Sequence, residues 1–193
     1  MAPKYGLASL PGLSMMRRMN TSKRVLGLGI AVLFATSLGG FGQTVQQVLL
    51  GGARYHQDNS SFVGYPFAKG DLSYGATYEY EDQNALWQLG VDVTPKFKSP
   101  SAEDYAVTPQ LNLLLKDQIF RGGLGILSTY TRDNAGKGDW MDLYWQFILG
   151  VEIPLPGRLV ASANAYYVFD KWDNLNSFDF KDVEYSASIG LKF

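Results

Sequence analysis

The sequence predicts an all-β protein, an eight-stranded antiparallel up-and-down transmembrane β-barrel preceded by a signal peptide. Three observations support this fold class. Apolar and polar residues alternate along most of the chain, the segments between the alternating runs are by turns short and long, and one uncharged apolar run lies near the N-terminus. The composition agrees, because 12 Tyr, 11 Phe, 4 Trp and 21 Gly accompany a mean hydropathy of only −0.09. Alternating strands produce such averages.

The N-terminal segment, residues 1–42, has the plan of a signal peptide. Two basic residues precede an uncharged run from residue 25 to residue 38, and glycines follow it. A basic region, an apolar region and a small-residue exit are the parts of a secretory signal. Cleavage would leave a mature domain of residues 43–193, and Met19 would also make a conventional start. An uncleaved membrane anchor is the alternative, but the run is shorter than the roughly 20 apolar residues that a spanning helix needs.

Period-2 alternation marks the expected strands in order. A less regular first strand is expected at about 47–56, and seven further strands at about 71–81, 85–94, 105–115, 120–130, 141–153, 159–169 and 183–193. Tight turns are expected at about 81–84, 116–118 and 154–157, and longer connections at about 57–70, 95–104, 131–139 and 170–181. Short and long connections therefore fall at opposite ends of the barrel. Within the fourth strand, Pro109 predicts a bulge or a break in pairing, because proline cannot donate a ladder hydrogen bond.

Alternation alone does not tell whether the apolar face points into a soluble barrel or out into lipid. The polar face is dominated by Gly, Ser, Thr, Gln and Asn, which suit the narrow interior of an eight-stranded barrel, whereas a soluble exterior would be crowded with Lys and Glu. Aromatic residues of the apolar face gather near the strand ends, as in the girdles of membrane barrels. We expect one girdle at the short-turn end (Tyr80, Trp87, Phe120, Phe193) and one at the long-loop end (Tyr55, Tyr74, Phe97, Tyr105, Tyr130, Tyr167, Phe169). A soluble barrel with these rings in its core is the alternative.

The closing segment, VEYSASIGLKF, alternates and ends on Phe193. It resembles the C-terminal signal by which the barrel assembly machinery recognises outer-membrane barrels, and its signal residues would be Tyr185, Ile189, Leu191 and Phe193. Together with the signal peptide and the strand count, residues 47–193 resemble the small bacterial outer-membrane β-barrels of the OmpA/OmpX type. The resemblance implies a place in the Gram-negative outer membrane, with long loops extracellular and both mature termini periplasmic. It implies outer-membrane lipids, lipopolysaccharide and the barrel assembly machinery as partners, and it brings no catalytic motif.

Alternation also directs a set of charged residues toward the barrel interior. In so narrow a barrel these groups should pair across the lumen, because an unpaired buried charge is very costly. The first interpretation is a side-chain plug, and the alternative is a polar pathway that opens when the pairs exchange partners. The expected interior network consists of Arg54, Glu79, Asp92, Arg121, Asp142, Glu152, Arg158, Glu184 and Lys192.

Several kinds of chemistry are disfavoured. With 17 Lys and Arg against 18 Asp and Glu, the chain lacks the electrostatic footprint of a nucleic-acid-binding protein. The absence of cysteine removes disulfides, zinc–thiolate sites and thiol catalysis, and no metal or other cofactor is expected. The only histidine, His56, is the one candidate general base, with Ser60 and Ser61 close in sequence. No spacing there marks a triad, so the chain is not expected to be an enzyme.

The last long connection interleaves acidic and aromatic residues. This combination suits divalent cations, lipopolysaccharide headgroups or a partner surface, although it lacks the EF-hand spacing. Solvated loop tips with interfacial aromatics are the alternative. The candidate binding residues are Asp170, Trp172, Asp173, Asn176, Asp179 and Asp182.

The sequence leaves three functional hypotheses. The first is an outer-membrane barrel with a structural or surface-interaction role and a plugged interior, whose surface ligand is unknown. The second is a narrow pore for ions or small solutes. The third is an outer-membrane lipid-modifying enzyme.

Overall fold

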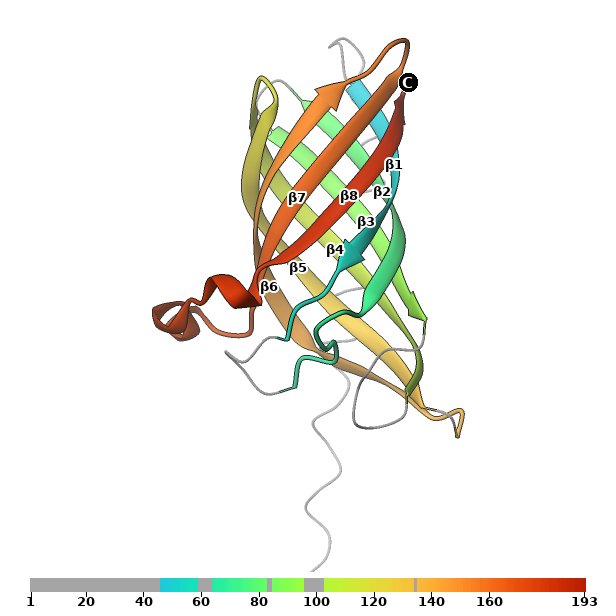
Figure 1. Ribbon diagram of the computed structural model, residues 1–193, viewed down its shortest axis with the longest axis vertical. Coiled ribbons are helices and arrows are strands. Elements are labelled where there is room, and N and C mark those ends of the chain that lie inside the picture. Colours follow the sequence, from blue (N-terminus) through green and yellow to red (C-terminus); the bar gives the residue numbers. More distant parts are fainter. Residues whose placement is uncertain (1–45, 59–63, 83–84, 96–102, 134) are drawn as a thin grey trace, which may run out of the picture. The chain divides into compact units, whose positions relative to one another are not determined.

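The computed structural model describes residues 46–58, 64–82, 85–95, 103–133 and 135–193. Eight antiparallel strands follow one another in chain order, and β1 also pairs with β8, which closes the barrel (Figure 1). The strands are β1 (Gln46–Tyr55), β2 (Leu72–Asp82), β3 (Ala85–Pro95), β4 (Glu103–Asp117), β5 (Phe120–Asp133), β6 (Gly138–Pro154), β7 (Leu159–Phe169) and β8 (Glu184–Lys192). The predicted fold class is confirmed. The predicted targeting segment, residues 1–42, lies outside the described residues.

The two ends of the barrel differ as the sequence predicts, with one exception. The C-terminal end of β8 lies at the end of the barrel that carries the turn between β6 and β7 (Figure 1). The connection between β5 and β6 was expected to be a long loop at 131–139, but β5 continues to Asp133 and β6 begins at Gly138. Asp133 N–H donates to the Lys137 carbonyl and closes a tight hairpin. Polar residues there continue the ladder beyond the apolar part of the strands.

Pro109 interrupts the sheet on one side only. It pairs with Val91 of β3, whereas the ladder between β4 and β5 passes from Val107 to Gln110 with no pair in between. The register is the same before and after this gap, so the expected disturbance is a local break in pairing and not a bulge. A missing N–H on one residue accounts for a gap of this kind.

Register shifts do occur elsewhere, and the one between β5 and β6 changes which side chains face inward. The ladder between β5 and β6 shifts between Ser128 and Tyr130, and the Ser128 hydroxyl donates to the Met141 carbonyl at 3.0 Å. An extra residue on one strand reverses the alternation beyond it. Met141 therefore packs against Leu127 inside the barrel, and Asp142 is exposed. The prediction that Asp142 belongs to the interior network is wrong for this reason.

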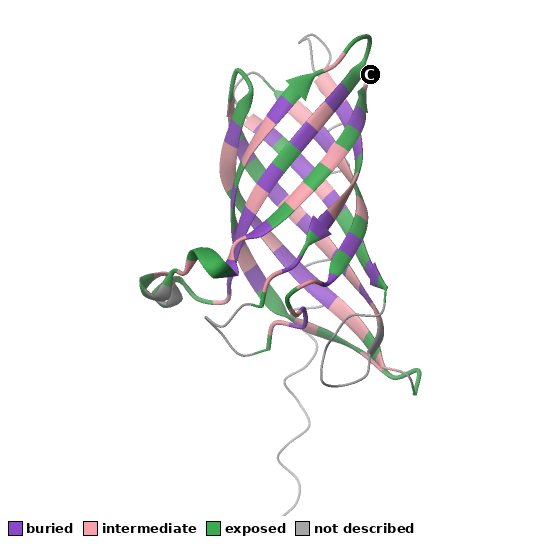
Figure 2. Ribbon diagram, in the orientation of Figure 1, coloured by how far each residue is buried: buried purple, intermediate pink, exposed green. Residues whose placement is uncertain are grey.

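The outer wall of the barrel is apolar. Buried and exposed residues alternate along the strands (Figure 2), and the exposed positions carry large hydrophobic side chains. They include Leu49, Tyr74, Val91, Leu113, Leu115, Phe120, Leu124, Leu149, Ile153, Ile189 and Phe193. Apolar surface that continues around a whole barrel is far larger than the patches that a soluble monomer exposes. Among the described residues, no helix is long and apolar enough to cross a membrane.

The inner wall alternates large polar side chains with glycines on neighbouring strands. Gly75 lies opposite Asp92, and Gly125 lies opposite Asn112. A Cβ atom on either glycine would collide with the side chain opposite it. The glycines therefore leave the space that the long polar groups occupy in the narrow interior.

Gly52→Val is expected to impair barrel formation, while Gly51→Val is tolerated. A Cβ on the inward Gly52 would overlap Ala187 and Ser188, whereas nothing lies within 4 Å of that position on the outward Gly51. Overpacking of this kind costs about 1–3 kcal/mol. The folded fraction after refolding in detergent micelles, read from heat-modifiable gel migration, would measure the difference. Equal folded fractions for both variants would contradict the tight packing of the inner wall.

Candidate functional site

The polar interior of the barrel is built around two clusters of charged side chains. The first, the short-turn cluster, contains Glu79, Lys116, Arg121, Glu152 and Lys192. Arg121 lies at its centre, with a fully buried side chain. Its Nη1 donates to Glu79 Oε1 at 2.8 Å and to Glu152 Oε2 at 3.3 Å. One guanidinium thus joins carboxylates from β2 and β6 across the lumen.

The same cluster extends toward the rim of the barrel. Lys116 Nζ lies 3.2 Å from Glu152 Oε1 and 2.8 Å from Glu81 Oε2, and Lys192 Nζ lies 3.5 Å from Glu152 Oε1. The charges balance, since the three cations of the cluster meet its two carboxylates and that of the neighbouring Glu81. Because Glu152 contacts all three cations, it links the buried part of the cluster to its half-exposed edge.

Neutral amides fill the middle of the barrel. Gln146 Nε2 donates to the side-chain oxygens of Gln110 and Asn112, at 2.9 and 2.7 Å. Gln110 Nε2 in turn donates to Asp92 Oδ2 at 3.0 Å. These contacts join strands β3, β4 and β6, and they give the Asp92 carboxylate a neutral donor.

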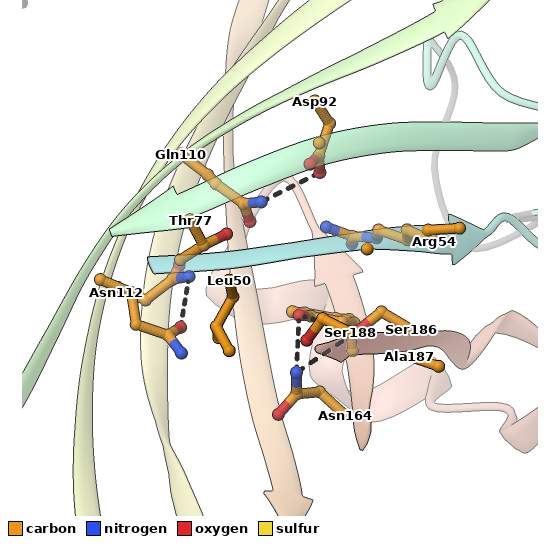
Figure 3. Close-up of a pocket in the computed structure, with 15 residues that line it drawn as sticks. Leu50, Arg54, Thr77, Asp92, Gln110, Asn112, Asn164, Ser186, Ala187 and Ser188 are labelled. Atoms are coloured by element: carbon orange, nitrogen blue, oxygen red, sulfur yellow. Dashed lines mark hydrogen bonds between the residues drawn. The ribbon is translucent and has the colours of Figure 1, made fainter. Parts of the chain in front are cut away.

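A cavity of about 30 Å³ lies among these amides. Arg54, Asp92, Gln110 and Asn164 line it (Figure 3). Arg54 Nη2 is buried and has no hydrogen-bond partner among the described residues. The volume admits water but no larger solute.

The second cluster, the mouth cluster, lies toward the long-loop end and contains Arg54, His56, Tyr65, Ser73 and Glu184. The Glu184 carboxylate is its centre. It accepts hydrogen bonds from Arg54 Nε at 2.6 Å and from the Tyr65 hydroxyl at 2.7 Å, and His56 Nδ1 lies 2.9 Å away. The Arg54 guanidinium also lies over the Tyr166 ring, 4.0 Å from its centroid. Both members of the buried ion pair thus have several partners, as such pairs need.

Tyr65 and Phe67 cover the mouth cluster at the long-loop end of the barrel. Both belong to the connection between β1 and β2. The Phe67 ring stacks on His56 at 4.0 Å and is itself buried. Burial and the nearby Glu184 carboxylate raise the pKa of Tyr65 well above its usual range, so its hydroxyl stays protonated and donates. The loop is therefore tied to the barrel interior by a buried hydrogen bond and by ring packing.

Ser73, His56 and Glu184 lie in the order of a serine–histidine–carboxylate relay. His56 Nε2 is 2.5 Å from Ser73 Oγ, and its other ring nitrogen faces Glu184. The Ser73 hydroxyl, however, lies 2.6 Å from Thr94 Oγ1, and the serine is only 1% exposed. A nucleophile must be able to reach a substrate carbon. The contacts around this serine are those of a buried structural network.

The structure brings most of the predicted interior residues together and leaves two outside. Arg54, Glu79, Asp92, Arg121, Glu152 and Glu184 are buried in the lumen, and Lys192 contacts Glu152 from the rim. Arg158 lies in the turn between β6 and β7 with an exposed side chain, and Asp142 is exposed beyond the register shift. Two of the nine predicted positions are thus wrong. Arg158 is wrong because the strand ends before it, so alternation does not apply there.

Sequence reasoning missed three members of the clusters. Lys116 was assigned to a turn, although it shares the inward parity of Asn112 in β4. Ser73 was visible on the inward face of β2, but nothing linked it to His56. Tyr65 carries no periodic signal, because it reaches the interior from a loop. Ser60 and Ser61, the hydroxyls predicted near His56, lie outside the described residues.

The predicted binding loop is folded against the outer wall. Trp172 begins the 3₁₀ helix η1 (Trp172–Ser177), and Asp182 ends η2 (Phe180–Asp182). Asp182 is buried, Asp170 and Asp179 are partly buried, and Asp173 and Asn176 are exposed. Within the described part of the chain, no group of three or more His, Cys, Asp or Glu side chains is arranged to hold a metal ion. The loop does not gather the predicted carboxylates into one site.

The strand count, the up-and-down order and the apolar outer wall are now established. The chain has the architecture of an OmpA/OmpX-type barrel. This bears out the resemblance at the level of fold.

Comparison with known proteins adds only distant structural similarity. No protein-family model and no curated protein matches the sequence. Neisserial surface protein A (NspA) is 13% identical, with a TM-score of 0.42 and coverage of 77% of this chain and 96% of that one. Ail, the attachment invasion locus protein of Yersinia pestis, is 13% identical, with a TM-score of 0.40 and coverage of 79% and 100%. Ail in complex with the heparin analogue sucrose octasulfate is 15% identical, with a TM-score of 0.41 and coverage of 77% of this chain and 98% of that one. At these values the similarity supports no shared function.

Proposed function

We propose that the chain is an integral protein of the Gram-negative outer membrane, with a structural or surface-interaction role and a plugged interior. Its long loops would be extracellular and both ends of the mature chain periplasmic. The observation that carries this proposal is the division of the barrel into two faces. Large hydrophobic side chains cover the outside, while charged and amide groups pair inside. This is the arrangement that lipid around a closed sheet requires.

The paired interior favours a plug over a pore. The short-turn cluster and the mouth cluster each join strands across the lumen, and a cavity of only about 30 Å³ lies between them. A narrow pore is the second candidate, because this cavity is lined by polar groups on the path between the clusters. It would conduct only if both clusters separated.

The C-terminal row supports the proposed assembly route. Tyr185, Ile189, Leu191 and Phe193 all face outward and are exposed. An apolar row at the last strand is accessible to a partner that recognises the barrel before membrane insertion. The barrel assembly machinery is the partner that we propose, and lipopolysaccharide and outer-membrane lipids would surround the finished barrel.

Purified, refolded protein is expected to give no steady single-channel conductance in planar bilayers, because two layers of paired charges block the lumen. The protein should also fractionate with the outer membrane and migrate differently in detergent gels before and after boiling, since a closed barrel has no free edge from which unfolding starts. A steady conductance would replace the plug with the narrow pore. Recovery in the soluble periplasm would overturn the membrane location.

A further inference from the structure

Aromatic side chains of the connection between β7 and β8 pack against aromatic side chains of the barrel wall. Tyr167 and Phe169 occupy outward positions on β7, yet they are only 4% and 0% exposed. The Trp172 ring lies 5.2 Å from Phe169 and 6.1 Å from Phe147, and Phe178 lies 4.6 Å from Tyr167. The loop therefore covers the outer wall of β6 and β7. It projects sideways from the barrel in Figure 1.

The covered rings are continued by uncovered ones. Phe180 packs edge-on against Phe178, with 4.9 Å between the centroids, and remains 80% exposed. Trp172 and Phe178 are about half exposed, at 48% and 47%. These rings extend the apolar outer wall sideways without a break. Aqueous loop tips rarely expose so large a continuous apolar surface.

The ladder places this loop at a definite level of the wall. The last residue of β7, Phe169, pairs with Trp145, while β6 begins at Gly138. β6 therefore runs seven residues beyond this level, roughly 23 Å along the strand at about 3.3 Å per residue. The loop therefore leaves the barrel wall well before the tip of the hairpin between β5 and β6 is reached.

That level matches the edge of the hydrocarbon on the long-loop side of the membrane. β7 has 11 residues, which span about 33 Å along the strand and about 25 Å along the barrel axis at the usual tilt. The apolar band of a membrane barrel is about 25 Å tall. A loop that leaves at the end of β7 therefore meets the interface, where aromatic rings are favoured.

We propose that residues 170–182 are an interfacial anchor, in which Trp172, Phe178 and Phe180 insert into the outer leaflet beside the barrel. The partner is the bilayer itself, at the boundary between headgroups and acyl chains. This inference rests on the proposed membrane location. It replaces the predicted binding site for cations, lipopolysaccharide headgroups or a partner surface with a part of the membrane-embedded surface.

The chain contains no cysteine, so single-cysteine variants with a nitroxide label can test the anchor. Phe180→Cys would carry the test label, Ile189→Cys on the outer wall would report barrel insertion, and Ala135→Cys at the hairpin tip would report water. Each protein would be refolded into phosphatidylcholine vesicles. Electron paramagnetic resonance would compare the collision rates of the label with oxygen and with a water-soluble nickel chelate.

We expect the ratio of oxygen to nickel collisions at position 180 to exceed that at 135 several-fold and to approach that at 189. A ratio at 180 equal to that at 135, with 189 still in lipid, would overturn the anchor and leave the membrane location intact. A water-like ratio at 189 would instead overturn the membrane location. Dipolar broadening at 180 that grows with protein concentration would show contact with a second copy, which also overturns the anchor. Labelling Phe178→Cys in the same way keeps the test decisive if the first variant does not fold.

Discussion

Arg121→Met is expected to lower the free energy of unfolding by about 3–5 kcal/mol. The guanidinium is the shared partner of Glu79 and Glu152, and its Nε donates to Asn164 at 3.0 Å. Its removal leaves the Glu79 carboxylate buried without a cation, with the Gln88 amide still donating a hydrogen bond to it. A carboxylate in that position is far more costly than the pair that it belonged to. Urea unfolding in detergent micelles, followed by tryptophan fluorescence, would measure the loss.

A second substitution separates charge imbalance from lost packing. Adding Glu79→Gln to Arg121→Met removes the orphaned charge and keeps the hydrogen bond from Gln88, so most of the lost stability should return. Arg158→Met is the matched control, because its exposed side chain belongs to a turn. Equal unfolding midpoints for Arg121→Met and Arg158→Met would show that the short-turn cluster does not stabilise the barrel.

Glu184→Leu is expected to have an effect of similar size, about 3–5 kcal/mol, at the other end of the lumen. The substitution leaves Arg54 buried with Gln146 as its remaining hydrogen-bond acceptor and removes the carboxylate to which the Tyr65 hydroxyl donates. The loop that closes the mouth would lose its tie to β8. We therefore also expect brief conductance events in planar bilayers, which the wild-type protein should lack.

Two comparisons make this result interpretable. Asp142→Leu removes an exposed carboxylate from the same end of the barrel and should leave stability and conductance unchanged. The pair Arg54→Met with Glu184→Leu removes both charges and should be more stable than Glu184→Leu alone. If Glu184→Leu unfolds like Asp142→Leu, the mouth cluster contributes little.

The sequence was sufficient to predict the barrel but not the position of every side chain in it. Strand order and the direction of the apolar face follow from the alternation of inward and outward side chains, called parity here, which needs only a regular strand. Parity failed at Asp142, where a register shift reverses it, and at Arg158, which lies past a strand end. It could not find Tyr65, whose contact with Glu184 depends on the path of a loop. Tyr167 faces outward as predicted, but the loop that covers it left no periodic signal.

The pairing of glycine with large polar residues on the inner wall has a consequence for how strands find their partners. A shift of two residues between β2 and β3 keeps every side chain on its proper face, so the lipid-facing side cannot oppose it. Such a shift would set Gly75 against Gly90 in place of Asp92, leaving a void at one level and crowding at the next. The packing of the interior therefore opposes a two-residue shift between β2 and β3 that the outer face would tolerate. It also implies that these positions change in concert: a larger residue at Gly75 requires a smaller one at Asp92.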